Sequence, residues 1–240
     1  MTPAEIVDLA VRAGLDSIEW GGDVHVPPGD IENARAVGEM TRSAGLEAAC
    51  YGSYYRLTDD EPGAAEAVVR TAKALGAPLI RVWAGRLGSA EADEAYRAMV
   101  CRNARRLCAL AAEAGINAAF EYHGGTLTDD AASACALLEA ADSPNLGTLW
   151  QPPVGMGAED CCASIRAVGP WVRNIHTFSW AGTERLPLAE GAEKWRILLS
   201  EIKKLPGERR LMLEFVRGDD PAQLMEDAAA LRRWLKGDFS

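Results

Sequence analysis

The chain has 240 residues, of which 48% are hydrophobic and 25% charged, and its formal net charge is −10 at pH 7. This length suits one large domain, and no apolar run approaches the roughly 20 residues of a membrane span. An acidic protein lacks the basic surface that binds a nucleic-acid backbone, so we expect a small-molecule substrate and neither nucleic acid nor membrane as a partner. The first residues predict an amphipathic helix rather than a secretory signal, and the six cysteines form no CxxC pair. Both features indicate a cytoplasmic protein with reduced thiols.

Helices and strands alternate from the start of the chain. Residues 3–13 have the apolar periodicity of a helix, and a short strand at 15–20 leads into a loop rich in glycine and proline at 21–29. Asp30 can cap the next helix, which Gly45 ends before a strand at 46–52. The same unit then recurs, with predicted helices at 61–75, 89–114, 130–141, 159–168 and around 195–202, strands at 79–85, 116–124, 146–151, 172–178 and 211–216, and a closing helix at 221–235.

This alternation predicts right-handed βαβ units and a parallel sheet of the α/β class. No linker or shift in composition divides the chain, so residues 1–240 are expected to form a single domain. The sheet is either closed into a TIM barrel or open and doubly wound. A barrel is favoured, because chemically active residues follow nearly every strand, which is where barrel active sites are built.

The predicted strands number seven, whereas a (β/α)8 barrel closes with eight, and a helix precedes the first of them. The N-terminal first strand is absent from this polypeptide, the barrel closes imperfectly, or another chain fills the gap. Unpaired edge strands invite association, so a homo-oligomer is expected.

Oxygen and nitrogen ligands follow the last four predicted strands. They are Glu121, Gln151, His176 and Glu214. Two carboxylates, an amide oxygen and an imidazole suit a divalent ion, with Mn²⁺ expected first and Co²⁺, Mg²⁺ or Zn²⁺ as alternatives. Carboxylates at the ends of buried strands are costly without a compensating cation, which favours a metal site.

Two histidines lie near the same strand ends. His123 is two residues beyond Glu121, on the same side of an extended strand, and is a candidate acid/base. His25, in the first loop, is a candidate substrate-binding residue or a partner for loop backbone groups. Glu19, at the end of the first strand, is interpreted as a structural hydrogen-bonding residue.

Three further residues are candidates for substrate binding. Arg217 suits a carboxylate or phosphate of the substrate, and its alternative is an ion pair with Asp219 or Asp220 on the surface. Trp83 and Tyr51 suit walls against sugar C–H faces, and their alternative is ordinary packing.

Five segments together resemble the xylose-isomerase-like TIM barrels, and more narrowly the sugar phosphate isomerase/epimerase family with its ketose 3-epimerases and inosose dehydratases. They read AGLDSIEW, FEYHG, LGTLWQ, NIH and LEFVRG, at 13–20, 120–124, 146–151, 174–176 and 213–218. The resemblance runs from Ala4 to Leu235 and is more specific for the fold and metal site than for the substrate.

The resemblance implies that Glu121, His176 and Glu214 are metal ligands, on the family's fifth, seventh and eighth strands. The remaining ligand is usually an aspartate with a histidine three residues later, and here Gln151 and Val154 stand in those places. Gln151 can still coordinate through its carbonyl oxygen, but it brings no negative charge and cannot act as a base.

The resemblance also implies that Glu121 and Glu214 work from opposite faces of the substrate. A metal acidifies the C–H next to a carbonyl, so one carboxylate removes the proton and a second acid returns it through an enediolate. This predicts an isomerase or epimerase of a sugar, sugar acid or polyol derivative. A lyase or dehydratase on a keto-sugar or keto-inositol is the alternative, and a barrel that binds a ligand or partner without turnover is the second.

Overall fold

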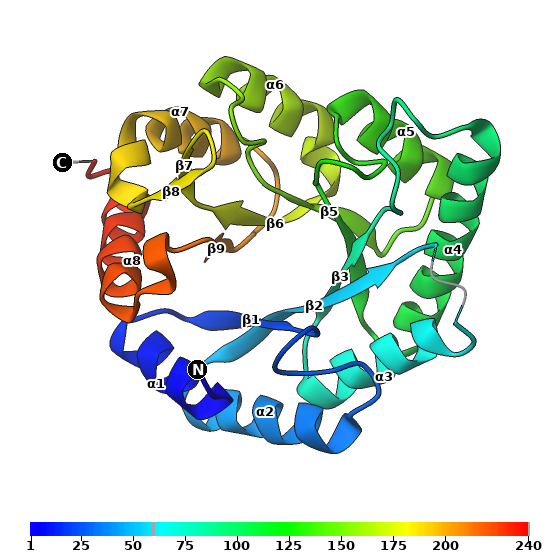
Figure 1. Ribbon diagram of the computed structural model, residues 1–240, viewed down its shortest axis with the longest axis horizontal. Helices are drawn as coiled ribbons and strands as arrows, with labels where there is room; N and C mark the ends of the chain where they lie inside the picture. Colours follow the sequence, from blue (N-terminus) through cyan, green and yellow to red (C-terminus); the bar gives the residue numbers. More distant parts are fainter. Residues whose placement is uncertain (59–60, 240) are drawn as a thin grey trace.

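The structure is a computed structural model that describes residues 1–58 and 61–239. In this part of the chain, seven parallel strands form one sheet that curves around a central space, with the helices outside it (Figure 1). The strands follow one another in the sheet as they do in the chain: β1 (Ser17–Gly21), β2 (Glu47–Arg56), β3 (Leu79–Trp83), β4 (Asn117–Glu121), β5 (Leu146–Trp150), β6 (Val172–Thr177) and β9 (Leu211–Leu213). The predicted seven-stranded barrel is therefore confirmed.

The helices cover the outer face of the sheet, and each turns an apolar face toward it. They are α1 (Pro3–Arg12), α2 (Ile31–Ser43), α3 (Ala64–Leu75), α4 (Glu94–Glu113), α5 (Ala131–Ala141), α6 (Ala158–Val168), α7 (Ala192–Ile202) and α8 (Pro221–Leu235). Aspartate side chains accept a first-turn backbone N–H at the start of four helices, from Asp30, Asp93, Asp130 and Asp220. None of the described helices is long and apolar enough to cross a membrane.

Three boundaries differ from the sequence prediction. Helix α4 begins only after Asp93, because this side chain caps the backbone N–H of Tyr96. The last strand stops at Leu213, since Phe215 has a φ of 54° that a strand cannot contain. A short antiparallel hairpin, β7 (Ser179–Ala181) and β8 (Glu184–Leu186), was not predicted.

The barrel has a seam. Strands β1 and β9 are the two edges of the sheet, and in the described residues neither pairs with the other. Figure 1 shows the two strands facing each other beside α1 and α8. The carboxyl ends of all seven strands consequently surround one mouth, but the wall is open on one side.

Candidate metal and active site

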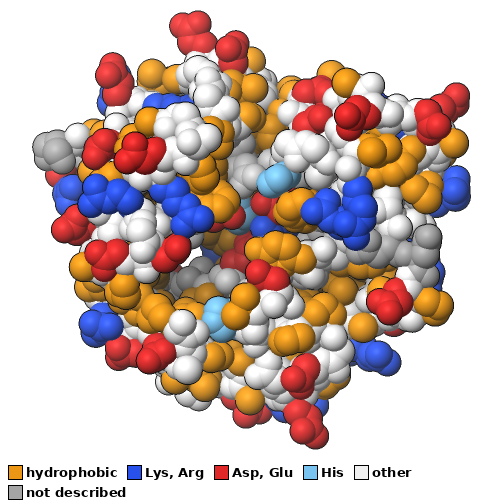
Figure 2. Space-filling view, viewed as in Figure 1, with side chains coloured by type: hydrophobic (Ala, Val, Ile, Leu, Met, Phe, Trp, Pro, Cys, Tyr) orange, Lys and Arg blue, Asp and Glu red, His pale blue; other side chains and the backbone are white. Residues whose placement is uncertain are grey.

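The four predicted metal ligands meet inside the mouth of the barrel. Glu121 ends β4, Gln151 follows β5, His176 lies in β6, and Glu214 follows β9. The ligand atoms of the two glutamates and the histidine lie within 4.8 Å of one another. Gln151 joins them, because its Oε1 is 2.9 Å from His176 Nδ1 and its Nε2 is 3.4 Å from Glu121 Oε1. Figure 2 shows this region as a central hollow with acidic and basic side chains in it.

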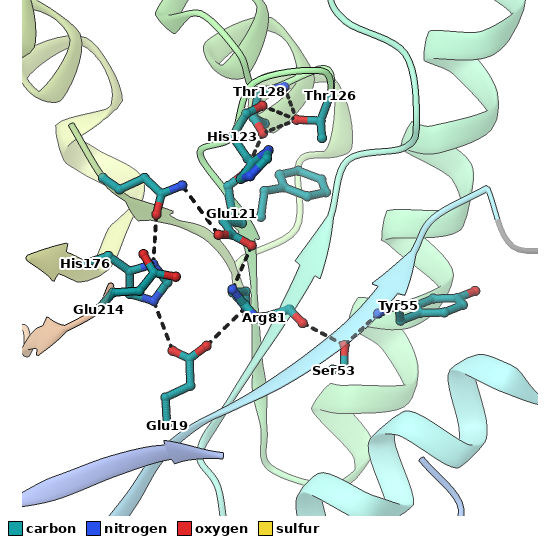
Figure 3. Close-up of polar contacts among 12 residues, drawn as sticks. Glu19, Ser53, Tyr55, Arg81, Glu121, His123, Thr126, Thr128, His176 and Glu214 are labelled. Atoms are coloured by element: carbon teal, nitrogen blue, oxygen red, sulfur yellow. Dashed lines mark hydrogen bonds and ion pairs between the residues drawn. The ribbon is translucent and has the colours of Figure 1, made fainter. Parts of the chain in front are cut away.

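Arg81 lies at the base of this group and was missed by the sequence prediction. It comes from the middle of β3, and its side chain is only 5% exposed. Its Nη1 donates to Glu121 Oε2 at 2.8 Å, and its Nε lies 3.1 Å from Glu19 Oε1 (Figure 3). Burial alone would lower the pKa of Arg81, but the two carboxylates outweigh burial and raise it. Arg81 is therefore a fixed positive charge that compensates two buried carboxylates.

Glu19 belongs to the centre of the site, and its interpretation as a structural residue near the rim was incomplete. Its Oε2 lies 3.3 Å from His176 Nε2, while its other oxygen faces Arg81. Burial acts to raise the pKa of Glu19, but the charges of Arg81 and His176 prevail and lower it to about 2. Glu19 is thus a carboxylate that links β1 to β3 and β6.

His176 is held from both ring nitrogens. Nε2 faces Glu19, whereas Nδ1 faces Gln151 and lies 3.2 Å from Glu214 Oε2. Burial would lower the pKa of this imidazole, but Glu214 and Glu19 together raise it to about 10. When Nε2–H donates to Glu19, the Nδ1 lone pair points to the other ligands, which is the arrangement that second-sphere carboxylates give to metal-binding histidines.

The donor atoms fit a divalent ion. Glu214 Oε2 is buried, yet it receives no hydrogen bond of acceptable geometry from the described residues. Two carboxylates, an imidazole and an amide oxygen match the oxygen and nitrogen ligation of Mn²⁺, Co²⁺ or Mg²⁺. Such an ion would give the orphaned oxygen the positive partner that it lacks.

Comparison with known proteins gives the family. Residues 7–236 match the family described as Xylose isomerase-like TIM barrel. The chain belongs to this family. A 3-dehydroshikimate dehydratase from Bacillus anthracis is 26% identical to it over 149 residues, and the match spans 52% of this chain and 51% of that protein. The chain thus spans about half of the length of this curated relative.

Solved structures share the fold of this xylose-isomerase-like barrel. The probable 3-DHS dehydratase AsbF of Bacillus anthracis superposes with a TM-score of 0.80 at 21% identity, over 97% of this chain and 94% of that one. A D-allulose 3-epimerase from Methylomonas sp. in complex with D-allulose has a TM-score of 0.70 at 17% identity, over 98% and 90% of the two chains. The fold therefore occurs both in a probable dehydratase and in a sugar epimerase.

In this xylose-isomerase-like barrel, His123 and Trp83 form one wall of the mouth. Their rings stack with centroids 4.4 Å apart, and the Arg56 guanidinium carbon lies 3.8 Å from the Trp83 ring centroid. His123 Nδ1 is 2.6 Å from the carbonyl oxygen of Gly124. The imidazole therefore stands above the ligand group as part of an aromatic wall, and its Nε2 is the nitrogen left to face a substrate.

The other three candidates lie away from the ligand group. His25 contacts the carbonyl oxygen of Met1 at 3.0 Å, at the edge of the mouth. Tyr51 is fully buried and donates its hydroxyl to the carbonyl oxygen of Val26, because alternate residues of β2 face opposite sides of the sheet. Arg217 is exposed and donates to Gln223 at 3.1 Å, and Asp219 pairs instead with Arg185.

Proposed function

We propose that the protein is a metal-dependent enzyme that removes a proton next to the carbonyl group of a sugar or related polyhydroxy compound. The observation that carries this proposal is the convergence of Glu121, His176 and Glu214 within 4.8 Å at the mouth of the barrel. These residues and Gln151 Oε1 would hold the divalent ion, with Mn²⁺ as the first candidate. When bound, the ion supplies a Lewis acid that acidifies the C–H beside the carbonyl.

The two glutamates differ in their freedom to act as a base. Glu121 is 3% exposed, and Arg81 holds one of its oxygens. Glu214 is 23% exposed, and neither of its oxygens receives a well-formed hydrogen bond from the described side chains. A carboxylate bound to a guanidinium is a weak base, because the cation stabilises its ionised form. We therefore assign proton abstraction to Glu214 and ligand positioning to Glu121.

The contacts of Glu121 favour dehydration of a keto-sugar or a related β-hydroxy carbonyl compound as the net reaction. Glu214 takes the proton from carbon, the C–H electron pair forms the new C=C bond, and the C–O bond to the β-hydroxyl breaks. The Glu214 carboxyl group then returns its proton to the departing hydroxide, and water leaves. A single mobile carboxylate is sufficient for this sequence, and the similarity to a 3-dehydroshikimate dehydratase supports it.

Isomerisation or epimerisation is the second candidate. It requires the same first step, followed by return of a proton to carbon from another acid. Glu121 is the acid implied by the family, and the similarity to a D-allulose 3-epimerase supports this outcome. The ion pair between Glu121 and Arg81 opposes it, since Glu121 would have to carry the proton.

Metal analysis and an exchange assay test the proposal. Protein purified without chelator should hold about one divalent ion per chain, and keto-sugars or keto-acids should exchange a C–H proton with D₂O. Glu214→Gln should retain the ion and lose exchange by at least about 100-fold. Glu121→Gln should lose affinity for the ion, and Glu139→Gln, an exposed control on α5, should change neither property. Loss of water from the product separates dehydration from epimerisation.

A chain without bound metal, and with no thermal shift in Mn²⁺, would overturn the proposal. The remaining interpretation would then be a barrel that binds a ligand without turnover.

A further inference from the structure

The seam of the barrel exposes two strands that a parallel sheet ordinarily buries. Strand β1 pairs only with β2 and strand β9 only with β6 in the described residues, and both pairings are parallel. Strands β3 and β5 are almost wholly buried, whereas β1 and β9 are mostly half-buried. Parallel sheets have both faces covered in nearly all proteins, so this exposure calls for a covering group.

A cavity of about 580 Å³ lies along the seam. Its walls are mainly apolar and come from both edge strands and from the inner faces of α1 and α8, through Leu9, Ile18, Leu211, Leu213, Leu224 and Leu231. At its upper end it reaches Glu19, His176 and Glu214. We call this space the seam groove. It connects the side of the barrel with the candidate metal site.

We propose that the seam groove binds one extended strand of polypeptide with apolar side chains, parallel to β1 and β9. The two walls are edges of one sheet and run in the same direction, so a single parallel strand can continue the ladder of backbone hydrogen bonds on both sides. Its side chains would alternate between the barrel interior and the helices α1 and α8. Addition of a strand to an exposed edge is a common mode of peptide recognition.

Charge sets the direction and composition of this strand. Arg209 and Arg210 precede β9 at the lower end of the seam groove, and the buried Nε of Arg209 has no hydrogen-bond partner among the described residues. Glu19 and Glu214 lie at the upper end. A strand parallel to β9 has its amino end beside the arginines. The occupant should therefore carry an acidic residue at its amino end and none at its carboxyl end.

A second folded copy of the chain does not meet these requirements. The free strands of a second barrel would be its own β1 and β9, and each is already paired on one side. Such a strand has one free edge and can pair with only one wall of the seam groove. The occupant must have both edges free, which excludes a strand that already belongs to a sheet.

A tethered strand tests this inference on the full chain. Met1 lies at the mouth, where its carbonyl oxygen contacts His25. An extension of one glutamate and a copy of residues 146–150 is joined ahead of Met1 by a short Gly/Ser linker. One control places proline at the centre of the added strand, since proline cannot donate to a ladder. The other replaces the added glutamate by lysine.

Amide hydrogen exchange and thermal unfolding are the measurements. The extension should slow exchange of residues 17–21 and 211–213 by at least about tenfold and raise the Tm by about 4 °C, without affecting β3. The proline control should lose both effects and the lysine control should retain only part of them. Equal effects of extension and proline control would overturn the inference. So would a dimer of the unextended chain that already protects these amides, as shown by sedimentation. These measurements use neither metal nor substrate, so they are independent of the proposed function.

Discussion

Glu19 shows how one side chain can order a site that it does not bind directly. It faces Arg81 through one oxygen and His176 through the other. Both partners are buried, and replacing Glu19 would leave Arg81 with a single carboxylate and His176 without a partner for Nε2. The first consequence concerns stability in acid.

Glu19→Gln should remove a pH-dependent part of the stability of metal-free protein. The pKa of Glu19 is about 2 in the folded protein against 4.5 ordinarily, so its stabilisation is complete above pH 4.5 and disappears as the pH falls toward 2. The shift corresponds to roughly 3 kcal/mol. Urea unfolding in EDTA from pH 7 to pH 3 should show a shallower pH dependence in the variant. Identical slopes would contradict the ion-pair assignment.

His176 should make metal binding pH-dependent. Its pKa of about 10 in the metal-free protein means that the imidazolium stabilises the fold at low pH, and that this contribution, complete below about 6.5, is lost as the pH rises through 10. A metal must displace this proton, so the affinity for Mn²⁺ should increase by about tenfold per pH unit. Calorimetry at pH 6.5, 7.5 and 8.5 measures it. A flat profile would show that Nδ1 is not a ligand atom.

Gly38 decides how closely two helices pack at the scale of elements. A Cβ atom at this position in α2 would lie 2.2 Å from the carbonyl oxygen of Leu75, at the end of α3. Backbone cannot move aside as a flexible side chain can, so α2 and α3 require a residue without a side chain here. This contact fixes the two helices that cover β1 and β2.

Gly38→Ala should therefore destabilise the protein, although alanine favours helices by about 1 kcal/mol over glycine. Overpacking of this kind costs about 1–3 kcal/mol, which outweighs the helical gain. Glu39→Ala, at the next and exposed position, is the matched control and should change stability little. Denaturant midpoints of the three proteins measure the effect, and a more stable Gly38→Ala would refute the close approach.

The whole barrel should be sensitive to metal because the ligands join distant parts of the sheet. They come from β4, the end of β5, β6 and the end of β9, so an ion would tie the edge strand to the interior of the sheet. Mn²⁺ at about 100 times its Kd should add about 2.7 kcal/mol and raise the Tm by several degrees. EDTA should reverse the shift, and Glu214→Gln should reduce it. An unchanged Tm would argue against a site at this place.

Local chemistry made much of the fold predictable. Asp30, Asp130 and Asp220 mark helix starts because a capping side chain acts within its own turn. The hairpin β7–β8 escaped prediction, since its strands have three residues each and no clear alternation. Arg81 carried a usable signal, because an arginine inside the apolar run 79–84 is rarely buried unless it is paired.

By itself, the sequence determined the alternation of helices and strands, the seven-stranded barrel, and the group of Glu121, His176 and Glu214 as candidate ligands. Periodicity, caps and strand ends are local properties, and the carboxyl ends of parallel strands must meet. Only the tertiary structure decided which charges pair. Glu19 meets His176 across 157 positions and Arg81 meets Glu121 across 40, and no local pattern specifies such contacts. The same is true of the seam groove, whose walls are the two edges of the sheet.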